Sequence, residues 1–464
     1  MSEIGFKIIE DAIPSIGKGI RRLLPGSQEK VVEKGAEVAG KGAGKLTEET
    51  VNFSREALAN GRLGKAVAIS FEEKGEEKIA EGVANITAAD PVVAIQEANA
   101  KYAKRYPELV KLKLKNMSES VFSFFRATNY LFYTDIAAEK SLATKVKIPS
   151  LGDLHLENIG TYMTKEGKIA LDLNDFDDAI IASYTWDLAR CATSIRLAAK
   201  EVGIAEKEAK EMVENFVKDY VKNLKKLAKN PEKLAKPLTE KEFGKHVEKM
   251  MKEAGNESQK SFIKDLTKDG KFVFSNSVTE ISGKTKSQIK EAIEPFLKEH
   301  RLKYKDAAFH IAGKGSLGRN RFIILAETPG KGKTENIIVE IKEAVQPAAA
   351  KVLGNTPGNQ ATRVTTAANY FLPDASPLLG VTKMEGIDYF IREFSPANKK
   401  IELSKLNKPG EMKDYIEAVS LVVARAHARS GKAGEIIEDA GSKSDLAERI
   451  GDFASGYVKK VESD

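Results

Sequence analysis

The sequence predicts an α+β protein in which a mainly β region lies between two helical segments. Alternating apolar and polar residues, broken by glycine-rich turns, predict antiparallel strands within residues 305–403. Apolar residues recur at helical spacing on both sides of this region. A strand, loop and strand pattern at residues 152–179 adds carboxylates to apolar runs, and buried charge is costly unless it is paired or binds a metal ion. These observations predict a helical body that carries a polar site.

Composition shifts divide the chain into four expected regions. The first is rich in Lys, Glu, Ala and Gly, with glycine-rich breaks that are typical of a loosely packed helical segment. The regions are a basic helical accessory region (1–100), a helical region with the polar loops (101–304), a small mainly β region (305–403) and C-terminal helices that return to the helical region (404–464).

The overall composition is that of a globular protein. Of 464 residues, 42% are hydrophobic, which suffices for sizeable cores. The 74 basic and 67 acidic residues give a net charge of +7, which favours a phosphate-bearing ligand only weakly, because mixed charge is usual on solvated surfaces. The single cysteine, Cys191, cannot form an internal disulfide and lies in an apolar helical pattern, so we expect a small core residue there.

The expected location follows from apolar runs. None is long enough to span a membrane, and the N-terminus lacks the uninterrupted apolar stretch of a secretory signal. A cytoplasmic protein is therefore expected, with export by machinery that reads other signals left open. Residues 6–24 form a basic amphipathic pattern that could contact an anionic membrane, although packing onto the protein is the commoner role of such a stripe.

Two polar loops carry the candidate chemistry. In the first, GDLHLEN (152–158), Asp153 precedes a short turn, where its carboxylate could accept a proton from an attacking hydroxyl. Asn158 and, from the second loop LDLNDFDDA (171–179), Asp175 offer the hard oxygen ligands that Mg²⁺ prefers. Asp, Asn and Gly also form ordinary turns, so one loop alone would be weak evidence. Together the loops predict a site for magnesium-dependent phosphoryl transfer.

A glycine-rich hairpin supplies candidate phosphate ligands. Residues 305–344 read as three antiparallel strands with a glycine-rich first turn, and residues 380–394 read as a further hairpin. Because no helix follows the glycines, a dinucleotide-binding fingerprint is disfavoured. A glycine loop between two strands, with a lysine on the third, suits a loop that covers nucleotide phosphates. The candidate nucleotide-binding residues are Gly313, Gly315, Ser316, Gly318 and Lys342.

Four further residues are candidates for a supporting role: Arg126, His155, Asp177 and Asp187. Arg126 lies in an aromatic stretch, where an arginine usually pairs with a carboxylate. Asp187 lies in the first turn of a predicted helix, where the helix dipole favours a carboxylate. Near the end of the predicted C-terminal helix, His427 and Arg429 could interact with the helix dipole or with phosphate.

Several motifs together carry a resemblance to a known superfamily. GDLHLEN, NDFDDA and WDLARCATSIRLA resemble the catalytic and metal-binding loops of aminoglycoside phosphotransferases and, more remotely, of protein kinases. With FSFFRA, GKGSLGRNRF, IKEA, YFIREF and ARAHARSG, the chain from Met117 to about Ser430 more closely resembles a bacterial family of uncharacterised proteins in the same superfamily.

The resemblance implies a two-lobed protein kinase-like fold with an extra N-terminal helical region. ATP and Mg²⁺ would be the cofactors, bound between the lobes in a bacterial cytosolic protein. Asp153 and Lys342 would be catalytic, Lys342 by holding the α and β phosphates, and Asp187 would brace the catalytic loop. By the same resemblance Arg126 could instead reach the active site or a phosphate, so both readings of this arginine stay open. In kinases the glycine-rich hairpin precedes the catalytic loop, whereas here Gly313 follows Asp153 and Asp175. The order therefore implies a circular permutation, which chains tolerate when the old termini meet at a surface.

Two departures from the resembling families bear on activity. Leu151 stands where the phosphotransferase loop has histidine. Kinases also pair the strand lysine with a glutamate on the next helix, yet Glu343 adjoins Lys342 and should point to the other face of its strand. Gln346, Gln360 or a residue from elsewhere could replace that glutamate. If none does, the protein is a catalytically altered kinase fold.

The sequence favours an ATP- and Mg²⁺-dependent phosphotransferase with an unknown hydroxyl acceptor. The alternatives are a nucleotide-binding pseudokinase that recruits partners, a kinase-fold nucleotidyl transferase and, from the lysines alone, a nucleic-acid binder, although no specific nucleic acid is expected. The lysine-rich residues 200–304 suggest an anionic small molecule, a lipid head group or an acidic protein as acceptor, and not a cationic aminoglycoside. The oligomeric state stays open.

Overall fold

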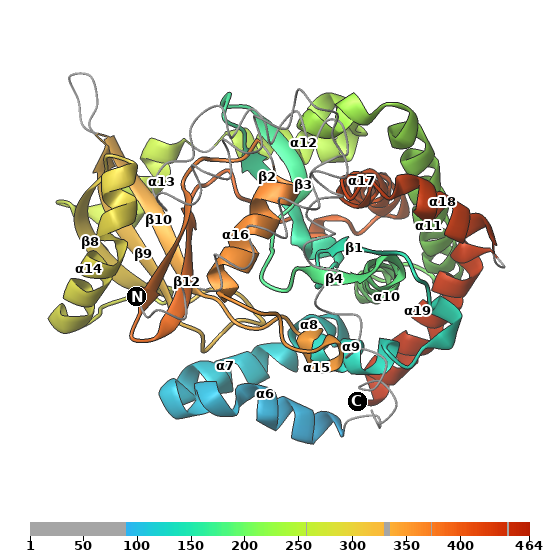
Figure 1. The fold of residues 1–464 in the computed structure, drawn as a ribbon, viewed down its shortest axis with the longest axis horizontal. Helices are drawn as coiled ribbons and strands as arrows, with labels where there is room; N and C mark the ends of the chain where they lie inside the picture. The colour runs from blue at the N-terminus through green and yellow to red at the C-terminus, as the bar shows by residue number, and fades with distance from the viewer. Residues whose placement is uncertain (1–89, 257, 329–334, 373, 443–444) are drawn as a thin grey trace, which may run out of the picture.

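The computed structural model describes residues 90–256, 258–328, 335–372, 374–442 and 445–464. The stripe predicted at residues 6–24 and nearly all of the accessory region predicted at 1–100 lie outside these ranges. The described chain is a mixed α and β protein, as predicted. Figure 1 shows a sheet on one side and a group of helices on the other, with short hairpins between them. No described helix is long and apolar enough to cross a membrane.

The sheet has six strands in the order β11-β12-β10-β9-β8-β7, and every pair of neighbours is antiparallel. Its strands are β7 (Val278–Thr279), β8 (Lys303–His310), β9 (Arg321–Thr328), β10 (Glu335–Glu343), β11 (Leu379–Met384) and β12 (Ile387–Glu393). The predicted three-strand run and the predicted second hairpin are therefore confirmed. The glycine-rich residues 311–320 connect β8 to β9.

Helices cover the sheet unequally on its two faces. α14 (Gly283–Glu299) covers one face, where Ile289 and Ile293 pack among the apolar side chains of β8–β10 and β12. On the other face, α13 (Gln259–Leu266) covers one end, and α16 (Gln360–Phe371) packs beside β11 and β12. Between these two helices the sheet presents charged side chains instead of apolar ones. This uncovered part of the face forms one wall of the candidate site.

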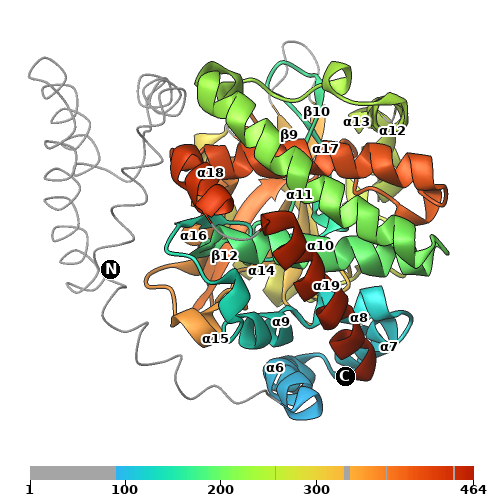
Figure 2. The same ribbon diagram turned by 90° about the vertical axis from the view of Figure 1, so that its right-hand side faces the viewer.

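The helical part is assembled from segments far apart in the chain. α10 (Tyr184–Glu201) and α11 (Glu206–Lys229) pack against α17 (Pro409–Ala428), α18 (Ala433–Ser442) and α19 (Leu446–Ser463), as Figure 2 shows. The apolar patterns of both segments predicted helices, and the large core of this part buries them together. Cys191 is buried within α10, as predicted.

Two short two-stranded sheets hold the polar loops between the large sheet and the helices. β1 (Lys147–Ser150) pairs with β4 (Ile180–Ser183), and β2 (Ile159–Met163) pairs with β3 (Ile169–Leu173), so both loops emerge from paired strands. α12 (Lys245–Gly255) packs on β3 and α17. β5 (Thr267–Lys268) and β6 (Lys271–Phe272) form a further hairpin, in which each strand is two residues long.

Four N-terminal helices of the described chain complete the fold. They are α6 (Pro91–Arg105), α7 (Pro107–Met117), α8 (Val121–Ala127) and α9 (Asn129–Ile136), and the one-turn α15 (Ala350–Leu353) lies beside α9. Asp90 caps α6, because its carboxylate accepts hydrogen bonds from the amides of Val92 and Val93. Lys101 and Arg105 of α6 pair with the buried Glu343 at the end of β10. This contact ties α6 to the sheet.

Candidate active site

A cavity of about 840 Å³ is lined by residues of the sheet and of the helical part. The two polar loops, the glycine-rich segment and the end of β10 all contribute to it. The predicted site residues that line it are Arg126, Asp153, His155, Asn158, Asp175, Asp177, Gly313, Gly315, Ser316 and Lys342. Gly318 and Asp187 do not line it. Most of the residues predicted from separate motifs thus share one cavity.

Asp153 is held in the cavity wall by an arginine of α10. The Arg190 guanidinium donates from Nε and Nη2 to Asp153 Oδ1, at 2.7 and 2.5 Å. Arg190 is fully buried between the rings of Phe125 and Phe132, so its position is fixed by packing. Burial raises the pKa of Asp153 to about 7, against the lowering effect of Arg190. The carboxylate is therefore oriented, yet it can take up a proton near neutral pH.

Gly152 brings the two polar loops into direct contact. Its φ of +77° is unfavourable for other residues, and a Cβ at this position would lie 1.8 Å from the carbonyl oxygen of Asp178. The Gly152 carbonyl accepts hydrogen bonds from Asn129 Nδ2 and from the Tyr133 hydroxyl, at 2.9 and 2.6 Å. Only glycine fits between these neighbours, which explains the residue before Asp153.

Asp187 lies outside the cavity and holds the first polar loop (152–158) by hydrogen bonds to its backbone. Its carboxylate accepts hydrogen bonds from the amides of Leu151 and Gly152, at 2.9 and 3.3 Å. His427 of α17 lies 3.4 Å from the same carboxylate, and its other ring nitrogen contacts the Tyr220 hydroxyl at 2.9 Å. His427 therefore contacts buried protein groups and does not face the cavity. Arg429 likewise pairs with the buried Asp172, at 3.2 Å, away from the cavity.

The acidic loop meets the strand lysine directly. Lys342 Nζ lies 2.6 Å from Asp177 Oδ2 and 4.0 Å from Asp175 Oδ1. Asp177 thus supplies the carboxylate that pairs with Lys342, and Glu343 points to the opposite face as predicted. Arg363 of α16 donates to the carbonyl oxygens of Asp177, Ala179 and Val345. This arginine joins the acidic loop to the end of β10.

Asp175 keeps its carboxylate directed to the cavity. About a third of its side chain is exposed, whereas Asp177 and Lys342 are nearly buried. Burial raises the pKa of Asp175, but Lys342, Lys400 and Arg392 outweigh burial and hold the pKa well below its usual range. An ionised and accessible carboxylate of this kind can bind a metal ion.

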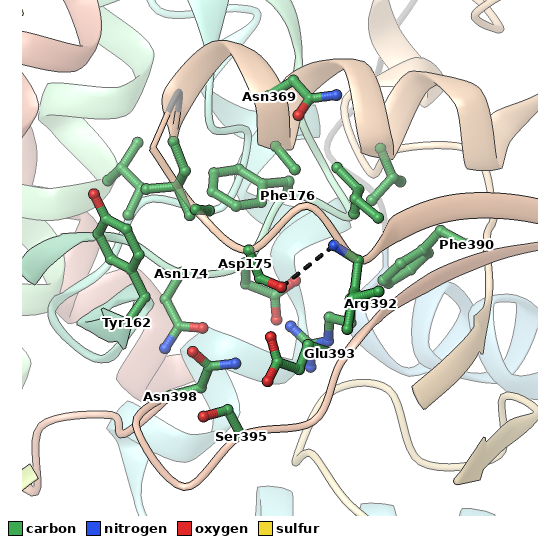
Figure 3. Close-up of a pocket in the computed structure, with 18 of the residues that line it drawn as sticks. Tyr162, Asn174, Asp175, Phe176, Asn369, Phe390, Arg392, Glu393, Ser395 and Asn398 are labelled. Atoms are coloured by element: carbon green, nitrogen blue, oxygen red, sulfur yellow. Dashed lines mark hydrogen bonds between the residues drawn. The ribbon is translucent and has the colours of Figure 1, made fainter. Parts of the chain in front are cut away.

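Phe176 anchors the acidic loop on its far side. Its ring stacks on Phe371 of α16, with centroids 5.6 Å apart and planes at 9°. A second cavity of about 110 Å³ opens there, and Asp175 and Arg392 line both cavities (Figure 3). In Figure 3 the dashed line joins the Asp175 carboxylate to the amide of Asp177, at 3.4 Å. Stacking next to Asp175 therefore helps to set the direction of that carboxylate.

His155 and Arg126 form the wall beside Asp153. Burial, with Arg126 and Arg190 nearby, holds the pKa of His155 well below its usual range, so the imidazole is neutral. Arg126 forms an ion pair with Glu157 and also lines the cavity. Arg126 therefore pairs with a carboxylate, which confirms the first reading, while its contact with a phosphate stays a prediction.

The glycine-rich segment lies against the N-terminal helices. Gly313 has a φ of +83°, and a Cβ there would lie 2.5 Å from the Ser316 hydroxyl. A Cβ on Gly315 would be 3.7 Å from the Arg126 carbonyl at the end of α8. Gly318, which was predicted to face phosphates, packs beneath Tyr102 of α6 instead, where a Cβ would approach within 2.8 Å.

A buried ionic cluster lies on the sheet wall of the cavity, and the sequence did not predict it. Glu340 is two residues before Lys342 on β10 and is almost fully buried. It contacts Arg392 at 2.7 Å, His310 at 3.2 Å and Arg321 at 3.5 Å. Burial opposes ionisation of Glu340, but these cations outweigh it and hold its pKa well below its usual range. A charged residue two positions from a lysine, within an apolar strand, was the available sequence signal.

Removing the Glu340 carboxylate should destabilise the fold. In Glu340→Ala, two guanidinium groups lose their buried counter-charge, so we expect the free energy of unfolding to fall by about 3–5 kcal/mol. Chemical denaturation at pH 7 measures this, with Glu335→Ala at the exposed start of β10 as the control that changes little. Because the folded pKa is depressed, this stabilisation is present above the unfolded pKa and is lost as pH falls. A loss similar to that of the control would contradict the role.

The cavity carries an excess of positive charge. Among the described residues, nine Lys and Arg and six Asp and Glu side chains line it. Lys113, Lys314 and Lys400 form no ion pair with a described carboxylate; they contact Asn99, Ser123 and Asn158 instead. Unmatched ammonium groups in a cavity favour an anionic ligand.

The fit to a magnesium ion rests on few ligands. Within the described ranges, no group of three or more His, Cys, Asp or Glu side chains is placed to hold a metal ion. Asp175 is ionised and accessible, whereas the Asn158 Oδ1 contacts Lys400 and its Nδ2 donates to the Asp153 carbonyl, at 2.8 Å. Mg²⁺ often binds one or two carboxylates together with phosphate oxygens and water, so this ligand set fits an ion that arrives with a nucleotide.

Most of the chain matches a known protein family. Residues 105–464 match the family described as "Uncharacterized protein conserved in bacteria (DUF2252)". No curated protein and no solved structure matches the chain. The matched residues include both polar loops, the glycine-rich segment, the whole sheet and the C-terminal helices. The chain therefore belongs to the DUF2252 family of bacterial proteins.

Proposed function

We propose that this protein is an ATP- and Mg²⁺-dependent phosphotransferase with a circularly permuted, two-lobed kinase-like fold. The observation that carries the proposal is the meeting of Asp153, Asp175, Lys342 and the glycine-rich segment at one cavity. These residues come from two segments, 153–175 and 313–342, that are far apart in the sequence, and no local pattern requires them to meet. Phosphoryl transfer uses a general base, a metal ligand, a cation that binds phosphate oxygens and a backbone segment that can approach the phosphates closely. Asp153, Asp175, Lys342 and the glycine-rich segment would supply them in that order.

The sheet topology supports the same proposal. The strand with the glycine-rich turn, the strand with Lys342 and the hairpin β11–β12 are neighbours in the order that a small kinase lobe would have. α16 lies between β10 and β11 in the chain and supplies Arg363 to the acidic loop. The permutation is supported by α17, because the Tyr415 hydroxyl of this late helix donates to the Leu156 carbonyl in the first loop.

Each residue has a chemical role in the proposed reaction. The Asp153 carboxylate accepts the proton of the acceptor hydroxyl, and Arg190 fixes its direction. Asp175 would hold Mg²⁺, which neutralises phosphate charge when bound with the nucleotide. Lys342, kept in place by Asp177, donates to phosphate oxygens. Asp187 and Gly152 position the loop that carries Asp153.

Nucleotide binding is the direct test. We expect Lys342→Ala and Asp175→Ala each to weaken Mg²⁺-ATP binding by about tenfold or more, since each removes a charged contact worth about 1.5–3 kcal/mol. Isothermal titration calorimetry measures the affinities. Lys383→Ala is the control, because this exposed lysine on β11 lies outside the cavity and should bind ATP normally. Absence of binding by the unmodified protein, or equal binding by all variants, would contradict the proposal.

Labelled ATP separates the proposed function from its alternatives. Transfer of a label from the γ phosphate to an acceptor in bacterial extract supports a phosphotransferase. Transfer of an α-phosphate label instead supports nucleotidyl transfer. Tight ATP binding with neither transfer supports a pseudokinase. An aminoglycoside tested as acceptor should remain unlabelled, because the cavity carries excess positive charge.

A further inference from the structure

Lys400 is a cavity residue that the proposed reaction does not yet use. It follows β12 in the chain, and its Nζ lies 3.3 Å from Asn158 Oδ1. The backbone there is fixed to β2: Lys400 forms an isolated antiparallel bridge with Gly160, and the Thr161 amide donates to the Lys399 carbonyl at 2.9 Å.

Gly160 permits this attachment. A Cβ at Gly160 would lie 2.6 Å from the Lys399 carbonyl oxygen and 2.5 Å from Asn174 Nδ2. The absence of a side chain therefore lets the two segments approach each other closely. Backbone pairing therefore fixes where the Lys400 side chain begins, and its ammonium contacts Asn158 at the cavity.

The charge of Lys400 lacks a direct partner. Lys342 pairs with Asp177, and Arg126 pairs with Glu157, whereas no carboxylate of the described chain lies within 4.0 Å of the Lys400 ammonium. Its close polar contact is a neutral amide oxygen. The side chain thus presents a positive charge to the cavity.

We propose that Lys400 supplies the positive charge at Asn158 that a second metal ion would otherwise supply. The site then takes one divalent cation, at Asp175, and the Lys400 ammonium donates to an oxygen of the terminal phosphate. The physical reason is competition: Mg²⁺ must approach a ligand oxygen to about 2.0–2.1 Å, and the ammonium already contacts that oxygen. This inference rests on the proposed function and reassigns Asn158 from the metal to Lys400.

The test counts metal ions in the nucleotide complex. Mn²⁺ replaces Mg²⁺, and a non-hydrolysable ATP analogue keeps the phosphates intact. Electron paramagnetic resonance of free Mn²⁺ gives the number of ions bound per chain, and calorimetry gives the affinity for the analogue. The variants are Lys400→Met, which removes the charge at similar length, and Lys400→Arg, which keeps it. Lys399→Met, next to it and outside the cavity, is the matched control.

We expect one Mn²⁺ per nucleotide complex in the unmodified protein, in Lys400→Arg and in the control. Lys400→Met should bind the analogue about tenfold or more weakly and should gain a second Mn²⁺ site. Two ions in the unmodified protein, or unchanged affinity and stoichiometry in Lys400→Met, would overturn the inference and leave the proposed function standing. Failure of the unmodified protein to bind the analogue would overturn both. The wild-type count decides the question even if a variant does not fold.

Discussion

Asp153→Asn should lower the rate of phosphoryl transfer about 10²-fold or more, with ATP affinity nearly unchanged. The amide keeps the shape of the carboxylate beside Arg190 but cannot accept the acceptor proton, and loss of a general base typically costs 10²–10⁴-fold. Single-turnover transfer from labelled ATP measures the rate, and calorimetry measures the affinity. Asp452→Asn, at an exposed position of α19, is the control for loss of a carboxylate.

The pH dependence provides a second readout of the same residue. Because burial raises the pKa of Asp153 to about 7, the carboxylate is increasingly protonated below that pH. The transfer rate of the unmodified protein should therefore rise about tenfold per pH unit below 7 and level off above it. The residual rate of Asp153→Asn should lack this step. A profile that is the same in both proteins would assign the base to another group.

Gly152→Ala should disrupt the site and destabilise the whole protein. The new Cβ would overlap the Asp178 carbonyl at 1.8 Å, and alanine would also have to adopt a φ of +77°. Backbone strain and overpacking each cost about 1–3 kcal/mol, so we expect the free energy of unfolding to fall by about 2–6 kcal/mol. Thermal and chemical denaturation measure the loss, and ATP transfer should fall with it.

Gly167→Ala separates the two causes. Gly167 has nearly the same φ, +75°, but nothing lies within 4 Å of a Cβ built there. This variant carries the backbone strain without the collision, so it should lose only about 1–3 kcal/mol and should retain ATP transfer. Equal losses in the two variants would show that contact between the polar loops contributes little.

The sequence predicted elements well where a local pattern specifies them. Alternation and turn residues predicted the antiparallel run β8–β10 and the hairpin β11–β12. The opposite directions of Lys342 and Glu343 also followed from the two-residue period of a strand. Here one short segment contains all the information that the prediction needs.

Partners from distant segments could not be predicted in this way. Lys400 meets Asn158 across 242 positions of the sequence, and Arg190 meets Asp153 across 37. Helical spacing placed Arg190 on α10 but did not say which loop α10 would face. Likewise, Gly318 fits a phosphate-binding pattern, and only its packing under Tyr102 shows its different role.

The return of the C-terminal helices to the helical part has a consequence for folding during synthesis. The strands of the six-stranded sheet follow one another without interruption from another domain, so the sheet can form soon after it leaves the ribosome. The core around α10 and α11 must wait for α17–α19, and Tyr457 near the end of the chain packs against Phe132. At usual elongation rates this delay is on the order of ten seconds or more. During that time the apolar faces of α10 and α11 are not yet covered by α17–α19. We therefore expect chaperones to bind this exposed apolar surface on the nascent chain.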